Sequence, residues 1–245
     1  PTVLTAFTSS KLGLTTSYPT VVRMSPSTDS KTDHSRAKFM VVVGSGQHGY
    51  DGRAASGTFG GANLLTFQIV QPGTVPETRV LPVGSETYGG FMGDPITYDR
   101  DLDFRSDVVY AGRTIDPSAG SVGYWWGKFY RLTMGTCSSS TCLTDTWGVN
   151  VSGNRVPTEM VMQVTTNGTT KYLGPATAGA TVTLDSTGNT WVFFGTGRFF
   201  SKSDKTDLRA QYLLGVKDSV MRSGGCTQTD AVNCTNQNLL DVSTA

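Results

Sequence analysis

The segment Val192–Gly197 reads VFFGTG, and two earlier segments repeat its pattern: Val41–Gly46 reads VVVGSG and Val108–Arg113 reads VVYAGR. In each copy, β-branched or aromatic residues run together and end in small residues. Such a run is typical of a strand that is buried on both faces of its sheet. Three copies in one chain predict an internal repeat of a single β unit.

The neighbours of these three runs are also similar. A strand entered through a proline precedes each run, in Tyr18–Val22, Asp94–Tyr98 and Gly174–Leu184. After a glycine-rich loop a third strand follows, in Asn63–Phe67, Gly127–Leu132 and Gln211–Val216. A fourth, outer strand is expected from Thr78–Val83, from Glu159–Thr165 and from the C-terminal tail. Strand, turn, buried strand, loop and strand form the core of a β-propeller blade.

We therefore predict an all-β fold in which residues 1–245 form part of a β-propeller, with three to four four-stranded antiparallel blades. The blade-like repeats are expected at about 12–75, 78–135 and 157–220, followed by a tail at 221–245. Because propellers use ~4–8 blades, the remaining blades are expected from another part of the same protein or from a companion chain. The alternative is a β-sandwich whose segments are similar by accident.

The composition agrees with many strands joined by many turns. Among the 245 residues are 29 glycines, and almost all acidic residues are Asp, which favours turns, and not Glu, which favours helices. The net charge of +1 gives no electrostatic case for nucleic acid as a partner. No apolar run approaches the ~20 residues that span a bilayer. The start at Pro1, without a signal peptide, is interpreted as a processed product or a fragment.

An acidic loop lies between the first and second strands of the middle repeat. Residues 99–107 read DRDLDFRSD, with aspartate at alternate positions and again at the end. Calcium takes ~6–8 oxygen ligands, and four carboxylates crowded into one hairpin would repel one another without a cation. We predict a Ca²⁺ site whose ligands are Asp99, Asp101, Asp103, the Arg105 carbonyl and Asp107. A solvated acidic turn and another metal are the alternatives.

One position of this loop departs from known calcium loops. EF-hand loops place glycine sixth because the chain turns sharply there, and here the sixth residue is Phe104. A phenylalanine in the left-handed region would be strained, so the loop is expected to turn differently or to bind calcium more weakly. The corresponding turn of the third repeat, Asp185–Asn189, is shorter and has one acid.

The four cysteines form two close pairs, Cys137 with Cys142 and Cys226 with Cys234. Two local disulfides are the simplest interpretation, and they indicate an oxidising compartment. The alternative, a zinc site, would need four ligands at spacings that this sequence lacks.

No motif indicates catalysis. The glycines in Gly44–Gly49 match a dinucleotide fingerprint, but no helical sequence follows them to hold a pyrophosphate. The two histidines, His34 and His48, lie in polar, loop-like sequence without a nucleophile motif. The cluster Tyr124–Trp126 could contact a sugar or a protein, although such residues more often pack under a blade edge. We expect a protein that is not an enzyme.

Two longer stretches resemble a known family. The segment 93–112 (GDPITYDRDLDFRSDVVYAG), followed by 126–132 (WGKFYRL), is similar to the calcium-loop blade of PilC/PilY proteins, the type IV pilus tip adhesins and assembly factors. The segment 189–199 (NTWVFFGTGRF), followed by Asp207 and by 211–218 (QYLLGVKD), resembles a later blade of the same family. The match extends from about Leu12 to Asp218.

The resemblance implies the C-terminal domain of such a protein, a modified seven-bladed propeller. It implies a calcium-binding, extracellular protein at the pilus tip, exported through the periplasm. Its expected partners are minor pilins and a host or abiotic surface, and its expected role is to support pilus assembly, extension and adhesion. Two alternatives are a quinoprotein-like, calcium-dependent dehydrogenase, of which Asp185–Trp191 is a partial motif, and a structural subunit of an extracellular filament.

Overall fold

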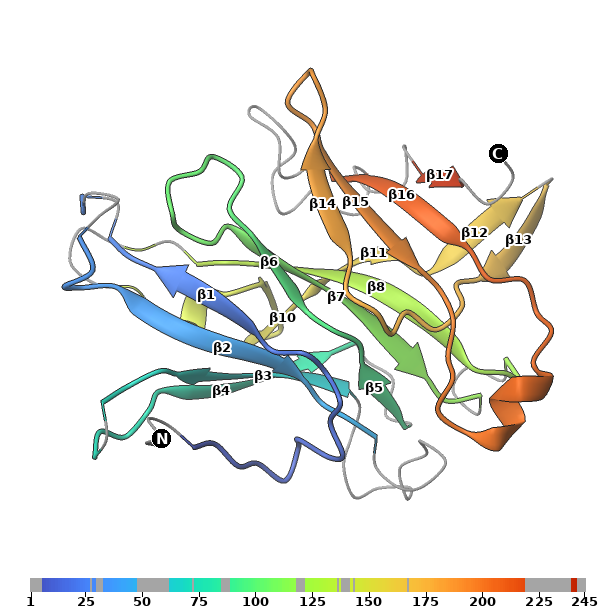
Figure 1. Ribbon diagram of the computed structural model, residues 1–245, viewed down its shortest axis with the longest axis horizontal. Coiled ribbons are helices and arrows are strands. Elements are labelled where there is room, and N and C mark those ends of the chain that lie inside the picture. The colour runs from blue at the N-terminus through green and yellow to red at the C-terminus, as the bar shows by residue number, and fades with distance from the viewer. Residues whose placement is uncertain are drawn as a thin grey trace.

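The computed structural model describes residues 6–218 and 239–241, apart from 27, 30–32, 48–61, 72, 85–88, 118–121, 136, 138–141, 143 and 167. This part of the chain is all-β, with three antiparallel sheets arranged side by side (Figure 1). Its helical elements are two short 3-10 turns, η2 (Thr144–Thr146) and η3 (Lys202–Thr206). No helix in it is long and apolar enough to cross a membrane.

The first sheet contains four strands in sequence order, as expected for a blade. They are β1 (Thr20–Met24), β2 (Lys38–Gly44), β3 (Ala62–Gln68) and β4 (Thr78–Val83). The predicted outer strand β4 is confirmed, and it pairs with β3 from Val83 opposite Ala62 to Thr78 opposite Phe67.

The second sheet has five strands, one more than predicted, because its first strand is interrupted. β5 (Gly90–Met92) and β6 (Ile96–Tyr98) pair with opposite ends of β7 (Val108–Ile115), and β8 (Trp126–Thr133) and β11 (Thr158–Val161) complete the sheet. The interruption at 93–95 contains Pro95, which has no N–H for a ladder. Gly93 is also required there, because a Cβ would lie 2.7 Å from the carbonyl oxygens of Ala176 and Thr177.

The third sheet repeats the four-stranded order and takes its outer strand from the tail. Its strands are β14 (Thr181–Leu184), β15 (Thr190–Gly195), β16 (Leu213–Asp218) and β17 (Leu239–Asp241). Two small hairpins lie outside the sheets, β9 (Val149–Val151) with β10 (Asn154–Val156), and β12 (Gln163–Thr166) with β13 (Thr169–Tyr172).

The outer strands of the first two sheets lie beyond the approximate repeat limits of 75 and 135. The outer strands β4 and β11 follow those limits in the sequence, yet they pair with β3 and β8 of the preceding unit. The first two sheets therefore end at Val83 and Val161.

The middle sheet is the centre of the core, because each of its faces packs on a neighbouring sheet. On β7, Val109 and Ala111 lie in the cluster shared with the first sheet, whereas Val108 and Tyr110 lie in the cluster shared with the third. This alternation follows from the two-residue period of a strand. All eight residues of β7 are buried, which confirms the prediction of a doubly buried strand for this run, whereas buried and partly buried residues alternate along β15 (Thr190–Gly195).

A buried polar contact also joins the second and third sheets. Asp218 of β16 accepts hydrogen bonds from the Tyr110 hydroxyl at 2.8 Å and from the Arg131 guanidinium at 2.5 Å. Both members of the Arg131–Asp218 ion pair are fully buried. Removing one partner would leave an uncompensated charge in the core, which typically costs ~3–5 kcal/mol.

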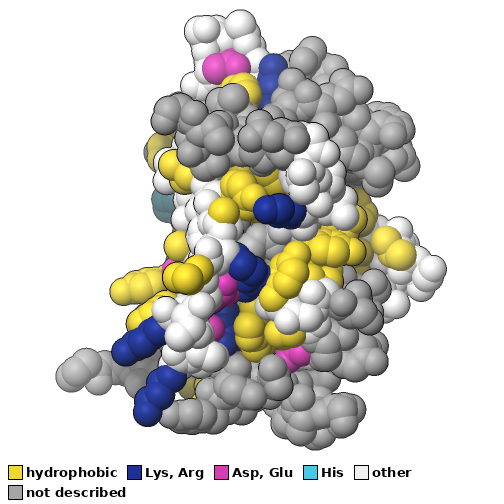
Figure 2. All heavy atoms as spheres, turned by 90° about the vertical axis from the view of Figure 1, so that its right-hand side faces the viewer, with side chains coloured by type: hydrophobic (Ala, Val, Ile, Leu, Met, Phe, Trp, Pro, Cys, Tyr) yellow, Lys and Arg dark blue, Asp and Glu magenta, His cyan; other side chains and the backbone are white. Residues whose placement is uncertain are grey.

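The side of the molecule that carries β13 and η3 shows hydrophobic side chains together with lysines and arginines (Figure 2). Several large apolar side chains are exposed there, among them Phe199, Phe200 and Leu208.

Candidate metal centre

The acidic loop connects β6 to β7 at one end of the middle sheet. It is closed by a hydrogen bond from the Asp107 N–H to the Tyr98 carbonyl at 3.0 Å. Inside it, Leu102 and Phe104 have φ angles of 56° and 66°, in the left-handed region that non-glycine residues rarely adopt. The loop thus turns at its sixth position as glycine-containing calcium loops do, although the residue there is phenylalanine.

Three of the four predicted carboxylates converge. Asp99, Asp101 and Asp107 each present a carboxylate oxygen, and these oxygens lie within 4.8 Å of one another. Two oxygens bound to one calcium ion at ~2.3–2.6 Å can be at most about 5 Å apart. The three oxygens therefore fit one shared ion, and an all-carboxylate donor set suits a hard cation such as calcium.

Backbone N–H groups of the loop orient these carboxylates. Asp99 accepts hydrogen bonds from the N–H of Phe104 at 2.7 Å and from that of Asp103 at 3.2 Å. Asp107 accepts one from the N–H of Arg100 at 2.7 Å. The turn that strains Phe104 thus also places N–H donors towards the acids.

The electrostatics of the loop favour a cation. Burial raises the pKa of the Asp107 carboxyl above its ordinary value, because the charged form is desolvated. The negative charges of the other three loop aspartates raise this pKa further, against the opposing effect of the hydrogen bond from Arg100. A bound cation would offset both the desolvation and the repulsion.

Asp103 lies apart from the converging three. Its carboxylate forms an ion pair with the Arg105 guanidinium and accepts a hydrogen bond from the Arg105 N–H at 2.7 Å. Among the described contacts, Arg105 takes part through its guanidinium and its N–H, and its carbonyl remains a predicted ligand. The sequence did not predict the role of this side chain.

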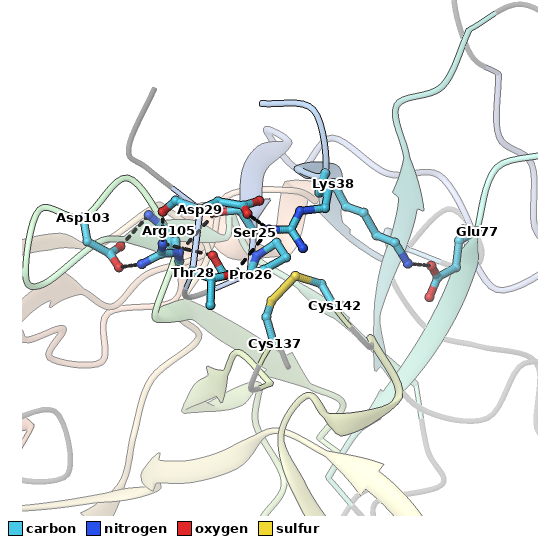
Figure 3. The surroundings of a disulfide bond; sticks show 11 residues. Ser25, Pro26, Thr28, Asp29, Lys38, Glu77, Asp103, Arg105, Cys137 and Cys142 are labelled. Carbon is cyan, nitrogen blue, oxygen red and sulfur yellow. Dashed lines mark hydrogen bonds and ion pairs between the residues drawn. A yellow bond between two sulfur atoms is a disulfide. The ribbon is translucent and has the colours of Figure 1, made fainter. Parts of the chain in front are cut away.

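Arg105 joins the acidic loop to the first sheet (Figure 3). Its guanidinium donates to the Ser25 hydroxyl at 3.1 Å and to the carbonyls of Pro26 and Asp29 at 3.1 and 2.9 Å. In the reverse direction, the Arg23 guanidinium donates to the Phe104 carbonyl at 2.7 Å. The loop is therefore connected to the corresponding β1–β2 connection of the preceding blade.

Arg100 joins the same loop to the third sheet. Its guanidinium donates to the Gly188 carbonyl at 3.0 Å, in the turn between β14 and β15. The acidic loop thus lies between the equivalent connections of both neighbouring blades and has a hydrogen bond to each.

The turn of the third sheet satisfies its single acid from within. Asp185 accepts hydrogen bonds from Thr187, from the N–H and side-chain amide of Asn189 at 2.9 and 2.8 Å, and from the Trp191 indole at 3.0 Å. These bonds, that of the Asn189 side chain above all, hold the pKa of Asp185 far below its ordinary value. The partial quinoprotein motif therefore has a structural explanation in this turn.

The predicted Cys137–Cys142 disulfide is present (Figure 3). A cavity of about 310 Å³ separates it from the acidic loop, and Arg105, Asp107 and Cys137 all contribute to the cavity lining. The pairing of Cys226 with Cys234 remains a prediction, since both residues lie outside the described part of the chain.

The described part of the chain forms an arc of three propeller blades whose middle blade carries the candidate metal centre. The C-terminal domain of Pseudomonas aeruginosa PilY1, a solved structure, has a similar fold, with a TM-score of 0.57 and 19% sequence identity. The match covers 92% of this chain and 40% of that one, so this chain spans about two fifths of the PilY1 domain. A scan of protein-family models and a sequence search of curated proteins gave no match.

This likeness confirms the prediction of a partial β-propeller, and it matches in fold the family resemblance that the sequence showed. It concerns the fold alone.

Proposed function

We propose that this chain is the calcium-binding part of a type IV pilus-associated protein that supports pilus assembly, extension and surface adhesion. The observation that carries the proposal is the convergence of the Asp99, Asp101 and Asp107 carboxylates in one blade of a PilY1-like fold. The fold alone suits many functions, so the site must support the argument.

Calcium bound here would supply positive charge to a group of acids that otherwise repel one another. Asp99, Asp101 and Asp107 are the proposed protein ligands. Asp103 keeps Arg105 in place, and the Arg105 carbonyl is a further proposed ligand. Water would complete the usual coordination number of ~6–8.

The contacts of the loop suggest how its occupancy reaches the surroundings. Arg105 and Arg100 connect the loop to the first and third blades. A fixed loop holds both arginines in position, so the three equivalent connections at this end of the blades form one ordered surface. Calcium then favours the state in which this surface is formed. A partner that binds only that state is retained when calcium is bound and released when calcium is lost.

The proposed partners are the remaining blades of the propeller, minor pilins at the pilus tip, and a host or abiotic surface. The proposed location is the bacterial cell surface, after transit through the periplasm. The Cys137–Cys142 disulfide supports this location, because disulfides form and persist in oxidising compartments.

We propose a role that is not enzymatic. The Asp185–Trp191 hydrogen bond gives the partial quinoprotein motif a structural function that requires no cofactor. Absorbance of the purified protein tests this, since a bound quinone would absorb in the visible range and contradict the proposal. Imaging of labelled protein separates a position at the pilus tip from one along a filament.

The test uses the double substitution Asp99→Ala with Asp101→Ala in the full-length protein. In bacteria that lack the wild-type copy, we expect pilus number to lose its dependence on calcium, because two of the three converging carboxylates are gone. Asp145→Ala is the matched control, since Asp145 is an exposed acid outside the cluster. A double variant whose pilus number responds to calcium as the wild type does would contradict the proposal.

A further inference from the structure

A second site lies on the side of the molecule opposite the first sheet, where the chain segments around β8, β13 and β16 meet (Figures 1 and 2). It is a pocket of about 280 Å³, and three tyrosines, Tyr124, Tyr172 and Tyr212, contribute to its lining. This volume is near the lower end of the ~300–1,000 Å³ that is typical of small-molecule sites, so the pocket can hold one ring-sized group.

Two of the three tyrosine rings are held in place by contacts with neighbouring side chains. The Arg209 guanidinium lies over the Tyr124 ring at 4.2 Å, and the Trp126 ring packs against Tyr172 at 4.8 Å. Arg209 is itself fixed by an ion pair with Asp207 and by a hydrogen bond to the Trp125 carbonyl at 3.0 Å. The Tyr124 and Tyr172 rings are therefore ordered before a ligand arrives, which lowers the entropic cost of binding.

Several polar groups of the lining residues are free to bind a ligand, whereas Arg209 and Gln211 already have partners in the protein. Within the described part of the chain, the hydroxyls of Tyr124, Tyr172 and Tyr212 have no hydrogen-bond partner, and neither has the ammonium of the exposed Lys171. A phenol both donates and accepts, and an ammonium donates three bonds. The described lining contains two cations, Lys171 and Arg209, and no acid.

We propose that this pocket binds an acidic sugar ring, a carboxylate-bearing unit at the end of a glycan. The apolar C–H face of a sugar ring packs on a flat aromatic side chain, its hydroxyls match the free phenols, and its carboxylate matches Lys171. The nearby Arg209 is neutralised by Asp207, so Lys171 supplies the charge that distinguishes an acidic sugar from a neutral one.

Gly174 keeps the pocket open. A Cβ at this position would lie 2.5 Å from the side-chain oxygen of Gln211, another lining residue. The new Cβ would also lie 3.1 Å from the side chain of Thr196, which donates a hydrogen bond to that oxygen, so Gly174→Ala would displace Gln211 and alter the pocket.

Saturation-transfer NMR and calorimetry on the full chain test the proposal, with methyl β-D-glucuronide and methyl α-N-acetylneuraminide as acidic probes and methyl β-D-glucoside as the neutral one. We expect binding of at least one acidic glycoside about tenfold tighter than of the glucoside, as a charge-assisted hydrogen bond allows. Lys171→Gln should remove this preference, and Lys202→Gln, an exposed lysine on η3, should keep it.

Two further variants test the contacts with the sugar ring separately from the contact with its carboxylate. Tyr212→Phe removes one hydroxyl and should weaken acidic and neutral glycosides alike by severalfold, as should Gly174→Ala. Melting temperatures establish that each variant is folded. The proposal is overturned if none of the three glycosides binds the wild type, if the preference survives Lys171→Gln, or if an aromatic peptide binds in this pocket and the sugars do not.

Discussion

The loops at 99–107 and 185–189 occupy the same place in neighbouring blades and treat their acids in opposite ways. Asp185 is surrounded by donors from its own turn, and its pKa is far below the ordinary value. In the middle blade three carboxylates face one another, and the pKa of Asp107 is raised. The same connection therefore forms a self-sufficient turn in one blade and a turn that favours a cation in the other.

The two loops also differ in their backbones. The third-blade turn places glycine at its left-handed position, Gly188 with a φ of 76°, whereas the middle loop places Phe104 there with a φ of 66°. The comparison indicates that the middle loop tolerates strain that its neighbour avoids. Arg100 joins the two directly through its bond to the Gly188 carbonyl.

We expect the largest effect in the stabilisation by calcium, which should depend on the middle loop and not on the third-blade turn. At a calcium concentration about 100 times Kd, binding stabilises the folded wild type by about 2.7 kcal/mol. Asp99→Ala with Asp101→Ala should abolish this rise in melting temperature, whereas Asp185→Ala should leave it intact. Differential scanning calorimetry with calcium and with chelator measures both, and an equal calcium response in the double variant and the wild type would remove the distinction between the loops.

The second prediction concerns the connection to the first blade. Arg105→Gln removes charged hydrogen bonds to Ser25 and to two carbonyls, so we expect a loss of about 2 kcal/mol in the free energy of unfolding. For a chain of this size that corresponds to a melting temperature lower by about 5 °C. Arg79→Gln on β4 is the control and should change the melting temperature by less than about 1 °C. Equal effects of the two changes would show that the Arg105 contacts do not stabilise the fold.

Substitutions at Gly188 and Phe104 would exchange the backbone properties of the two turns. Gly188→Ala should destabilise the protein by about 1 kcal/mol, because nothing crowds the new Cβ and the cost is that of the left-handed backbone. Phe104→Gly should raise stability by up to about 1 kcal/mol, since Phe104 is 62% exposed and its removal relieves strain while losing little packing. Urea unfolding of both variants measures the pair, and a destabilised Phe104→Gly protein would mean that the aromatic ring matters more than the turn.

The smallest expected effect is the pH dependence of the stability that the Asp185 carboxylate contributes. Its folded-state pKa is below the unfolded value, so its carboxylate contributes stability above about pH 4, and this contribution is lost as the pH falls further towards the folded pKa. The stability difference between the wild type and Asp185→Ala should therefore be largest at neutral pH and shrink below about pH 4. Urea unfolding at pH 7, 4 and 3 measures it, and a difference that is constant with pH would contradict this assignment.

Much of the fold could be predicted because burial leaves a local pattern. The three apolar runs became β2, β7 and β15, and the outer strand at Thr78–Val83 was predicted with its observed limits. The break between β5 and β6 and the hairpin of β12 with β13 were missed. These short elements lack a period of their own and depend on neighbours that a single sequence does not reveal.

The site could be predicted in position and only partly in detail. Alternating aspartates marked the loop, since spacing along the chain is local information. The contacts of Arg105 with Ser25 and Pro26 depend on the arrangement of two blades. Likewise, the tyrosine pocket combines residues from three distant segments, of which only the cluster at Tyr124 was visible in the sequence.

The central claim, that the converging carboxylates bind calcium, is tested most directly by crystallography with calcium at a long X-ray wavelength. The account predicts one anomalous peak at ~2.3–2.6 Å from the carboxylates of Asp99, Asp101 and Asp107. Well-ordered density for residues 99–107 with no anomalous peak among these three side chains, at a saturating calcium concentration, would contradict it.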